Sequence, residues 1–316
     1  MKISGFSFVR NATKLYLPVW ESISSVLPMV DEFVLALGKG DVDDRTLEEI
    51  ERLNSDKVRI INTQWDIECF QKNTIYAQQT DVAKRECAGD WLLYIQSDEV
   101  IHENHHQKIV TACEKELNNK KVEAFVFDFR HFWGDYDHHH KSHAWYPQEI
   151  RIIRNRDDIH SWKDAQSFRS FETFEETFED YSRKEGARKL NSKRIHADIF
   201  HYGYVRPPEM MTMKSKSSST SYHGKEKSAE RLKDLPIAWD YGPLNRIPVF
   251  KDTHPKVMEE WISKLDWVDK LQYSGNVNEN RPSHKHERLK YRMLSFFEQS
   301  LLNGRSIGGF QNFKMI

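Results

Sequence analysis

The feature that most constrains this chain is a fully apolar run of residues that ends in acidic ones. Residues 91–95 read Trp-Leu-Leu-Tyr-Ile, and Gln96, Ser97, Asp98 and Glu99 follow directly. A run with no polar face indicates a strand that is buried on both sides, as in the centre of a parallel sheet. Ligands of open α/β sheets bind at the carboxyl ends of strands, so we expect Asp98 and Glu99 to border a site. A solvated strand end, or a cap for the next helix, is the alternative explanation.

The first half of the chain alternates short apolar runs with amphipathic ones. This alternation predicts an α/β fold with a mostly parallel central sheet flanked by helices. The expected strands are 3–9, 32–37, 58–61, 91–95, 122–132 and 149–154, and the expected helices are 17–27, 46–53, 75–87 and 103–117.

The last third of the sequence has a different character. A polar helical stretch is expected at 210–233, and two amphipathic helices are expected at 256–271 and 287–302. We predict a main α/β domain over residues 1–215 and a helical C-terminal extension over residues 216–316, without expecting two independent folding units. The apolar faces of the last two helices are expected to pack on the main domain, to close its acceptor side or to form a homodimer.

The charges of the chain are nearly balanced, with 47 basic and 48 acidic residues and a net charge of −1. Such a chain has no overall field to attract a nucleic-acid backbone, so nucleic-acid binding is not expected. No apolar run reaches the roughly 20 residues of a transmembrane helix, and the first residues lack a signal-peptide pattern. The three cysteines, Cys69, Cys87 and Cys113, show neither a disulfide framework nor a metal-ligand spacing. These features predict a cytoplasmic protein.

The order of several short motifs resembles that of family-2 inverting glycosyltransferases, which have the A-type glycosyltransferase fold. In that family an apolar strand ends in Asp-x-Asp-Asp/Glu, as residues 96–99 do in part. The run from Ile3 resembles the opening strand, whose end, here Asn11, touches the nucleotide. Asp44 matches the Asp-x-Thr that closes the loop after the second strand, and Asp81 begins the helix that leads into the acidic strand. The resemblance places Asn11, Asp44 and Asp81 on the nucleotide side of the site.

This resemblance covers about residues 1–215 and also implies an activity. It implies an inverting transferase that moves a sugar from a nucleotide-sugar donor to a sugar, glycan or glycolipid acceptor. It also implies a divalent cation, Mn²⁺ or Mg²⁺, at the acidic motif. By analogy with the family, the chain is expected to act in polysaccharide biosynthesis, with peripheral association at the inner membrane face as one option.

Two positions depart from the family pattern. Gln96 stands where the first Asp of the acidic motif is expected, which leaves Asp98 as the metal ligand. Glu99 is then expected to support that ligand or to serve the acceptor side. Lys39 stands where the family usually holds an Asp that recognises the base, so uridine specificity does not follow. Gln96 and Lys39 are still expected at the donor, with Lys39 near a phosphate, and a solvated lysine is the alternative for Lys39.

A second cluster of candidate residues lies between residues 195 and 214. Many A-type glycosyltransferases use a late histidine as a metal ligand, and His201 resembles that residue, with His196 as its rival. Imidazole nitrogen and carboxylate oxygen together make a plausible Mn²⁺ ligand set. Arg206 and Lys214 follow closely and are expected to neutralise the leaving diphosphate. A hydrogen-bonded histidine near a strand end is the alternative for His201.

Inverting transfer also needs a base that takes the proton of the acceptor hydroxyl. In the resembling enzymes this base lies between the acidic strand and the late histidine, where Asp164 and Glu149 are candidates. We predict Asp164, because the neighbouring Trp162 is placed to stack on an acceptor ring. The His138–His140 run is predicted to lie in an exposed loop over the acceptor cleft, since three consecutive histidines do not readily converge on one metal.

Two other functions compete with transfer. The departure at Gln96 leaves open a degenerate relative that binds a nucleotide sugar, or scaffolds a complex, without turnover. A nucleotidyltransferase is a further alternative, but such enzymes carry a Gly-rich basic loop near the N-terminus. Residues 3–14 hold only Gly5, Arg10 and Lys14, so this pattern does not favour that alternative.

Overall fold

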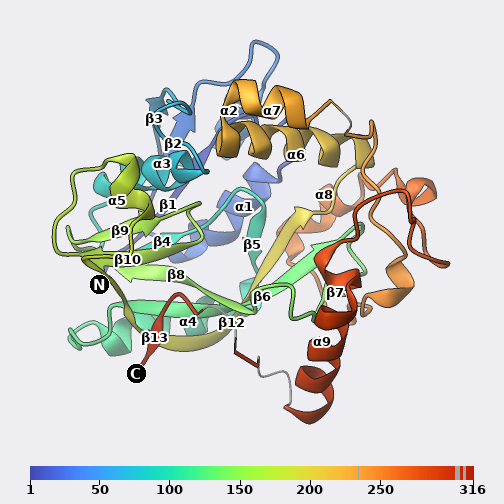
Figure 1. The fold of residues 1–316 in the computed structure, drawn as a ribbon. Coiled ribbons are helices and arrows are strands. Elements are labelled where there is room, and N and C mark those ends of the chain that lie inside the picture. Colours follow the sequence, from blue (N-terminus) through green and yellow to red (C-terminus); the bar gives the residue numbers. More distant parts are fainter. Residues whose placement is uncertain (234, 303–306, 309–310) are drawn as a thin grey trace.

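The computed structural model describes residues 1–233, 235–302, 307–308 and 311–316. Its centre is a mixed sheet in the order β13-β12-β6-β8-β4-β1-β2-β3 (Figure 1). Helices lie on both faces of this sheet, so the expected α/β class with flanking helices is confirmed. No helix in the described ranges combines the length and apolarity that crossing a bilayer requires.

One half of the sheet is parallel. It consists of β1 (Ile3–Val9), β2 (Glu32–Gly38), β3 (Val58–Thr63) and β4 (Trp91–Tyr94). β1 lies between β2 and β4, so the carboxyl ends of these strands meet at one edge. The apolar run in β4 is buried along its whole length, as the sequence predicts.

The other half of the sheet mixes directions. β8 (Gln148–Arg154) runs antiparallel to both β4 and β6 (Ala124–Trp133). The long β12 (Asn191–Tyr204) is parallel to β6. The remaining strands of this sheet are β5 (Glu99–Ile101) and the C-terminal β13 (Lys314–Met315), which pair with β12, and β7 (His139–His140), which pairs with β6. A separate small sheet holds β9 (Ile159–Trp162), β10 (Ser167–Phe171) and β11 (Ala187–Lys189).

The two faces of the sheet have separate cores because successive strand residues point to opposite sides. Trp91 and Leu93 pack with α1 (Val19–Val26), α2 (Thr46–Glu51) and α4 (His106–Glu116). On the other face, Leu92 and Tyr94 pack with α3 (Thr74–Arg85) and the small sheet. The short α5 (Phe178–Ser182) contacts α3 and β9. The described 3₁₀ turns are Leu27–Met29, Glu103–His105, Leu244–Arg246, Lys256–Met258, Val268–Lys270 and Lys285–Glu287.

The C-terminal third differs from the prediction in two places. The single helix expected at 210–233 is two helices, α6 (Pro208–His223) and α7 (Lys225–Arg231). They part at Gly224, whose φ of 78° an ordinary helix residue does not adopt. The predicted domain boundary at residue 215 falls inside α6.

The predicted helix at 256–271 is wrong. Only α8 (Glu259–Ile262) forms there, with 3₁₀ turns on either side. Trp267 and Leu271 are buried against the ends of β6 and β12 instead of lying on one helix face. The indole Nε1 of Trp267 donates to the Gly134 carbonyl at 2.9 Å. This packing decides the backbone path more strongly than the helical spacing of the apolar residues. The last helix, α9 (Leu289–Leu301), lies close to its predicted range.

Candidate active site

A cleft of about 330 Å³ opens at the carboxyl ends of β1 and β4. The first turns of α3 and the middle of α6 form further walls, together with the end of β12. Open α/β sheets bind their ligands at this edge. The lining residues are Phe8, Val9, Arg10, Asn11, Leu15, Leu17, Trp65, Asn73, Tyr76, Gln96, Ser97, Asp98, Trp145, Tyr146, Asp164, His201, Tyr204, Lys214, Ser217 and Ser218.

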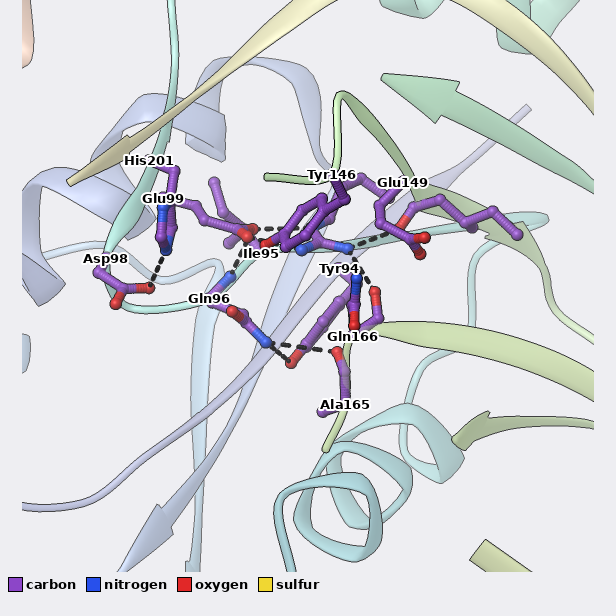
Figure 2. A network of polar contacts seen from close by, with 12 residues as sticks. Tyr94, Ile95, Gln96, Asp98, Glu99, Tyr146, Glu149, Ala165, Gln166 and His201 are labelled. Atoms are coloured by element: carbon purple, nitrogen blue, oxygen red, sulfur yellow. Dashed lines mark hydrogen bonds and ion pairs between the residues drawn. The ribbon is translucent and has the colours of Figure 1, made fainter. Parts of the chain in front are cut away.

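Asp98 lies on the floor of this cleft, in the turn that follows β4. Its Oδ2 accepts a hydrogen bond from Lys214 Nζ at 2.8 Å. Its Oδ1 lies 3.9 Å from His201 Nε2 (Figure 2). Burial raises the pKa of Asp98, but the charges of Lys214 and Arg206 oppose this effect, and the pKa lies well below its usual range. Asp98 is therefore a carboxylate at neutral pH.

The protonation of His201 follows from the atoms that its neighbour His131 contacts. His131 Nε2 lies 2.8 Å from the carbonyl oxygen of Tyr146, which can only accept, so this nitrogen carries a hydrogen. Burial lowers the pKa of His131 well below its usual value, so the ring is neutral and its Nδ1 is an acceptor. His201 Nδ1 lies 3.0 Å from that acceptor and must therefore donate to it.

This chain of contacts leaves a lone pair on His201 Nε2. Burial also lowers the pKa of His201, so the ring is neutral and its second nitrogen has no hydrogen. The lone pair thus lies opposite the Asp98 carboxylate, 3.9 Å away. Two electron-rich atoms that face each other fit a positively charged group between them, and Mn²⁺ and Mg²⁺ accept nitrogen and oxygen ligands of this kind. The two predicted metal ligands therefore lie together and fit a divalent cation.

Gly203 keeps the space beside these two ligands open. A Cβ atom on Gly203 would lie 2.5 Å from His201 Nε2 and 2.9 Å from Asp98 Oδ2. Any larger residue would therefore fill the position next to both ligand atoms. Among the described residues, no group of three His, Cys, Asp or Glu side chains surrounds a metal position. Further ligands would have to be phosphate oxygens or water.

A half-buried cation, Lys214, and a buried one, Arg206, accompany the Asp98 carboxylate on the floor. Lys214 Nζ also donates to the Gly203 carbonyl at 2.9 Å, and burial, followed by the charge of Arg206, lowers the pKa of Lys214 to about 8. Arg206 is fully buried and donates to the carbonyl oxygens of Leu15 and Gly203. Arg206 does not line the cleft, so it acts on a bound anion only through its charge. Together these groups favour a negatively charged ligand.

Glu99 does not reach the cleft, so a catalytic role at the acceptor side is wrong, whereas its other expected role, support of Asp98, agrees with its contacts. Its carboxylate is fully buried and accepts two hydrogen bonds from Arg151, at 2.7 and 2.6 Å. It also accepts from the backbone amide of Gln96 at 3.2 Å (Figure 2). A bidentate, buried pair of this kind fixes geometry, so Glu99 holds the turn that carries Asp98.

Asp164 lies in the same cleft, on a tight turn between β9 and β10. Its neighbours Lys163 and Ala165 both have φ near 58°, a left-handed conformation that turns Asp164 outward. The side chain is exposed to the cleft, and desolvation by the cleft walls still raises its pKa above the ordinary value. Gln96 Nε2 donates to the carbonyl of Ala165 at 3.3 Å and to the Tyr94 hydroxyl at 3.2 Å (Figure 2). The departure at Gln96 thus ties this turn to the end of β4, which an aspartate cannot do.

Two predictions around Asp164 are wrong. Trp162 is only 3% exposed, its Nε1 donates to the Arg183 carbonyl and Arg169 packs on its ring, so it cannot stack on an acceptor. Glu149, the rival base, is 1% exposed, lies outside the cleft and accepts from Asn312 at 2.6 Å. Burial raises the pKa of Glu149 to about 7. Glu149 belongs to the scaffold behind Arg151.

The residues predicted for the nucleotide divide between two cavities. Asn11 lines the main cleft, and its Oδ1 accepts from the amide of Asp41 at 2.9 Å. Lys39 and Asp44 line a second cavity of about 510 Å³ at the ends of β2 and β3. Asp44 Oδ1 accepts from the hydroxyls of Thr13 and Thr46, so it also fixes the loop after β1.

Asp81, the rival ligand His196 and the His138–His140 run lie away from the cleft. Asp81 is buried, and it accepts from His160 Nδ1 and from the Ser161 amide, both at 2.9 Å. It therefore joins α3 to β9. His196 is exposed at a bulge of β12, where its carbonyl accepts from Lys108. The His138–His140 run is buried, with two residues in β7, so the prediction of an exposed loop is wrong.

Several residues in or directly behind the cleft were not predicted. His131 lies directly beside His201 in the ladder between β6 and β12. The alternation of 122–132 places His131 on the same side of its strand as Phe129, which is a signal that was available in the sequence. The others have no local signal, because distant segments bring them together: Trp65, Tyr76, Trp145, Tyr146, Gly203 and Tyr204.

No family model and no curated protein sequence matches the chain. Solved structures with a similar fold include S. aureus TarS, at 15% identity and a TM-score of 0.37, over 75% of this chain and 41% of that one. TarS 1–349 in complex with UDP-GlcNAc is similar at 14% identity and a TM-score of 0.36, over 73% and 70% of the two chains. Glucosyl-3-phosphoglycerate synthase from Mycobacterium tuberculosis, in complex with Mn²⁺, UDP and phosphoglyceric acid, is similar at 15% identity and a TM-score of 0.29, over 41% and 43%. The likeness is distant and concerns the fold, so the case for a function rests on the cleft itself.

Proposed function

We propose that this chain is an inverting glycosyltransferase that moves a sugar from a nucleotide-sugar donor to a sugar, glycan or glycolipid acceptor. The observation that carries the proposal is the arrangement of Asp98, His201 and Lys214 on the cleft floor. The His201 Nε2 lone pair lies 3.9 Å from one oxygen of the carboxylate, and the Lys214 ammonium group donates to the other oxygen. This arrangement suits a cation together with a diphosphate.

The donor would lie across the carboxyl ends of β1 and β4. Three aromatic rings, Phe8, Trp65 and Tyr76, contact one another along the same cleft, with ring centroids 5.5 to 5.8 Å apart. Aromatic faces of this kind suit a nucleobase or a sugar ring. Asn11 and Lys214 are the polar residues that we assign to the nucleotide and the diphosphate.

Asp98 and His201 are the residues that would hold a divalent cation, Mn²⁺ or Mg²⁺. Such a cation, when bound, neutralises the charge that develops on the leaving diphosphate. Lys214 supplies a second positive charge to the same oxygens, and Arg206 adds a third from beneath the floor. His131 keeps the His201 lone pair directed into the site by accepting its other N–H.

Asp164 is the base in this proposal. The acceptor hydroxyl oxygen forms a bond to the anomeric carbon, while the bond from that carbon to the phosphate oxygen breaks. The hydroxyl proton moves to the Asp164 carboxylate, and the nucleoside diphosphate leaves beside Lys214. A raised pKa suits this role, because a base is most effective when its pKa is near the working pH.

A thermal-shift panel of UDP-, GDP-, dTDP- and CMP-sugars, each with and without Mn²⁺, tests the donor assignment. A bound donor stabilises the folded chain by mass action, so one nucleotide should raise the unfolding temperature in a metal-dependent way. Asp98→Asn should abolish this shift, and Asp56→Asn, an exposed carboxylate distant in sequence, should keep it. A full metal-dependent shift in Asp98→Asn would refute the assignment.

The same samples distinguish an enzyme from a binding protein. Transfer or donor hydrolysis in the presence of Mn²⁺ supports the enzyme. Specific, metal-dependent binding without transfer to any acceptor tested would support a degenerate relative that only binds the nucleotide sugar. The glutamine at position 96, in place of the first acid of the family motif, is the reason to consider this alternative.

A further inference from the structure

The last helix of the chain is amphipathic, but its polar side is the one that contacts the protein. Glu298, in the middle of this side of α9, is 3% exposed and lies 2.6 Å from His143 Nδ1. Ser295 Oγ accepts from the His143 amide at 2.9 Å, and Gln299 Nε2 donates to the Lys141 carbonyl at 3.2 Å. The helix is thus attached to the 141–143 loop by hydrogen bonds rather than by an apolar core.

The apolar side of α9 faces solvent. With about 3.6 residues per turn, Leu289, Met293, Phe296 and Phe297 recur on one face. Their side chains are 69%, 52%, 65% and 41% exposed, and Leu301 continues the stripe at 69%. Large apolar side chains gathered on one exposed face indicate an interaction surface. Figure 1 shows α9 at the periphery of the molecule.

The charges around this stripe are of one sign. Between residues 285 and 302 the exposed charged side chains are all basic: Lys285, Arg288, Lys290 and Arg292. The two acids of the segment are both buried, Glu287 against Arg281 and Glu298 against His143. On the helical wheel Arg292 flanks the Phe296 side of the apolar stripe, and Lys290 lies on its other side, between Phe297 and Leu301.

We infer that α9 binds the surface of an anionic lipid bilayer, with its apolar stripe inserted among the acyl chains and its basic residues at the headgroups. Helices that lie in the membrane interface have this combination of an apolar face and basic borders. Each basic residue near an anionic bilayer adds to the attraction. This inference goes beyond the proposed transfer reaction and does not depend on it.

A second copy of the chain fits the same surface less well. A two-fold interface brings the same patch of each protomer together. The four basic residues of one copy would then approach those of the other with no exposed acid in the segment to compensate. Like charges across an interface oppose association, whereas phosphate headgroups complement them.

Vesicle co-sedimentation of the full chain tests the inference. The probes are vesicles of phosphatidylcholine alone and of phosphatidylcholine with one quarter phosphatidylglycerol. We expect binding to the anionic vesicles and at least about tenfold weaker binding to the neutral ones, with 0.5 M salt reducing the former. Phe296→Gln with Met293→Gln should reduce binding about tenfold or more, because two inserted apolar side chains are lost.

Matched variants separate the apolar and the charged contributions. Val42→Gln removes a fully exposed apolar side chain elsewhere and should leave binding unchanged. Lys290→Glu with Arg292→Glu should weaken binding to anionic vesicles, whereas Lys115→Glu with Lys120→Glu on the exposed part of α4 and its following loop should not. The altered side chains are exposed, so the unfolding temperature of each variant should match that of the unaltered chain.

The oligomeric state completes the test. Light scattering without lipid should find the same mass for the unaltered chain and for the Phe296→Gln, Met293→Gln variant. Two results would overturn the inference: no preference for anionic vesicles, or a dimer that the variant dissociates while vesicle binding is absent.

Discussion

Two walls of the cleft hold their functional groups in different ways. The first, here called the cation wall, is the part of the cleft described above as its floor and consists of Asp98, His201 and Lys214. Polar contacts hold all three: Lys214 donates to Asp98, His131 contacts His201, and the Glu99–Arg151 pair fixes the turn that carries Asp98. The turn wall, residues 163–165, presents Asp164 on a left-handed turn that Gln96 ties to β4. The wall assigned to the leaving group is therefore prearranged, as electrostatic stabilisation of charge requires. The turn wall, which is assigned to the acceptor, is held by fewer hydrogen bonds to the rest of the protein.

Asp164→Asn should have the largest effect of the changes to the turn wall. Transfer should fall about 10²–10⁴-fold, because the asparagine cannot take the acceptor proton. Donor binding should not change, because the cation wall is intact. In the unaltered chain, transfer should decline as the pH falls through the raised pKa of Asp164, since the protonated acid is no base. Initial rates against pH and donor affinities provide the measurement.

The control for this change is Asp157→Asn, an exposed acid in the turn before β9. It should retain the transfer rate and its pH profile. Full activity in Asp164→Asn would show that the base is another group.

Glu149→Gln should change stability and leave transfer intact, in contrast to Asp164. The pKa of Glu149 is raised to about 7 in the fold, so the folded chain holds a proton that the unfolded chain releases above about pH 4.5. Stability is therefore lost as the pH rises from about 4.5 to 7, and the full penalty of about 3 kcal/mol is present above that range. Denaturant unfolding at pH 5 and pH 8 should show a smaller difference for Glu149→Gln than for the unaltered chain. Identical pH dependence in both would contradict this account.

Gly203→Ala tests the open space in the cation wall. Its Cβ would lie 2.5 Å from His201 Nε2, so metal-dependent donor binding should weaken about 10–100-fold. The backbone at Gly203 has no left-handed φ, so the strain of alanine is confined to its contact with the His201 ring and the Asp98 carboxylate, and the unfolding temperature without ligand should fall modestly. Isothermal titration with the donor measures the effect. Unchanged affinity would mean that the cation and diphosphate lie elsewhere.

Gln96→Met should have the smallest effect. It removes the hydrogen bonds to Ala165 and Tyr94 without adding charge, so transfer should fall about twofold to tenfold at constant donor affinity. The exposed Gln107→Met serves as its control. A loss of donor affinity with an unchanged rate constant would assign Gln96 to the cation wall instead.

The sequence predicted the parts of the fold that local pattern determines. The buried strand β4 and the strand–helix alternation before it were predicted from the spacing of apolar residues along the chain. Both predictions are confirmed. The helix predicted at 256–271 failed because Trp267 and Leu271 are buried in a core that the ends of two distant strands complete. The same limit applies to the candidate site. Motifs predicted Asp98 and His201, which lie together in the cleft, whereas the position of Gly203 beside both follows only from the path of β12 past the end of β4.

Glu99 and Trp162 show the opposite limit, because an acceptor-side role was expected for both from their position near cleft residues. Glu99 follows Asp98 directly and Trp162 lies two positions before Asp164, but neither side chain reaches the cleft. The partner that engages Glu99, Arg151, is 52 residues away, and the one that engages Trp162, Arg183, is 21 residues away. Neither contact follows from a local pattern.

The central claim is that His201 Nε2 and Asp98 hold the cation that binds the donor, and a pair of histidine variants tests it most directly. His201→Asn removes the lone pair that faces Asp98. His196→Asn, on the same strand, changes an exposed histidine whose φ of 58° asparagine tolerates. The measurement is the Mn²⁺-dependent affinity of each variant for the nucleotide sugar that stabilises the unaltered chain. The account predicts at least a roughly 10–100-fold loss for His201→Asn and none for His196→Asn. Equal affinities in both variants would contradict it.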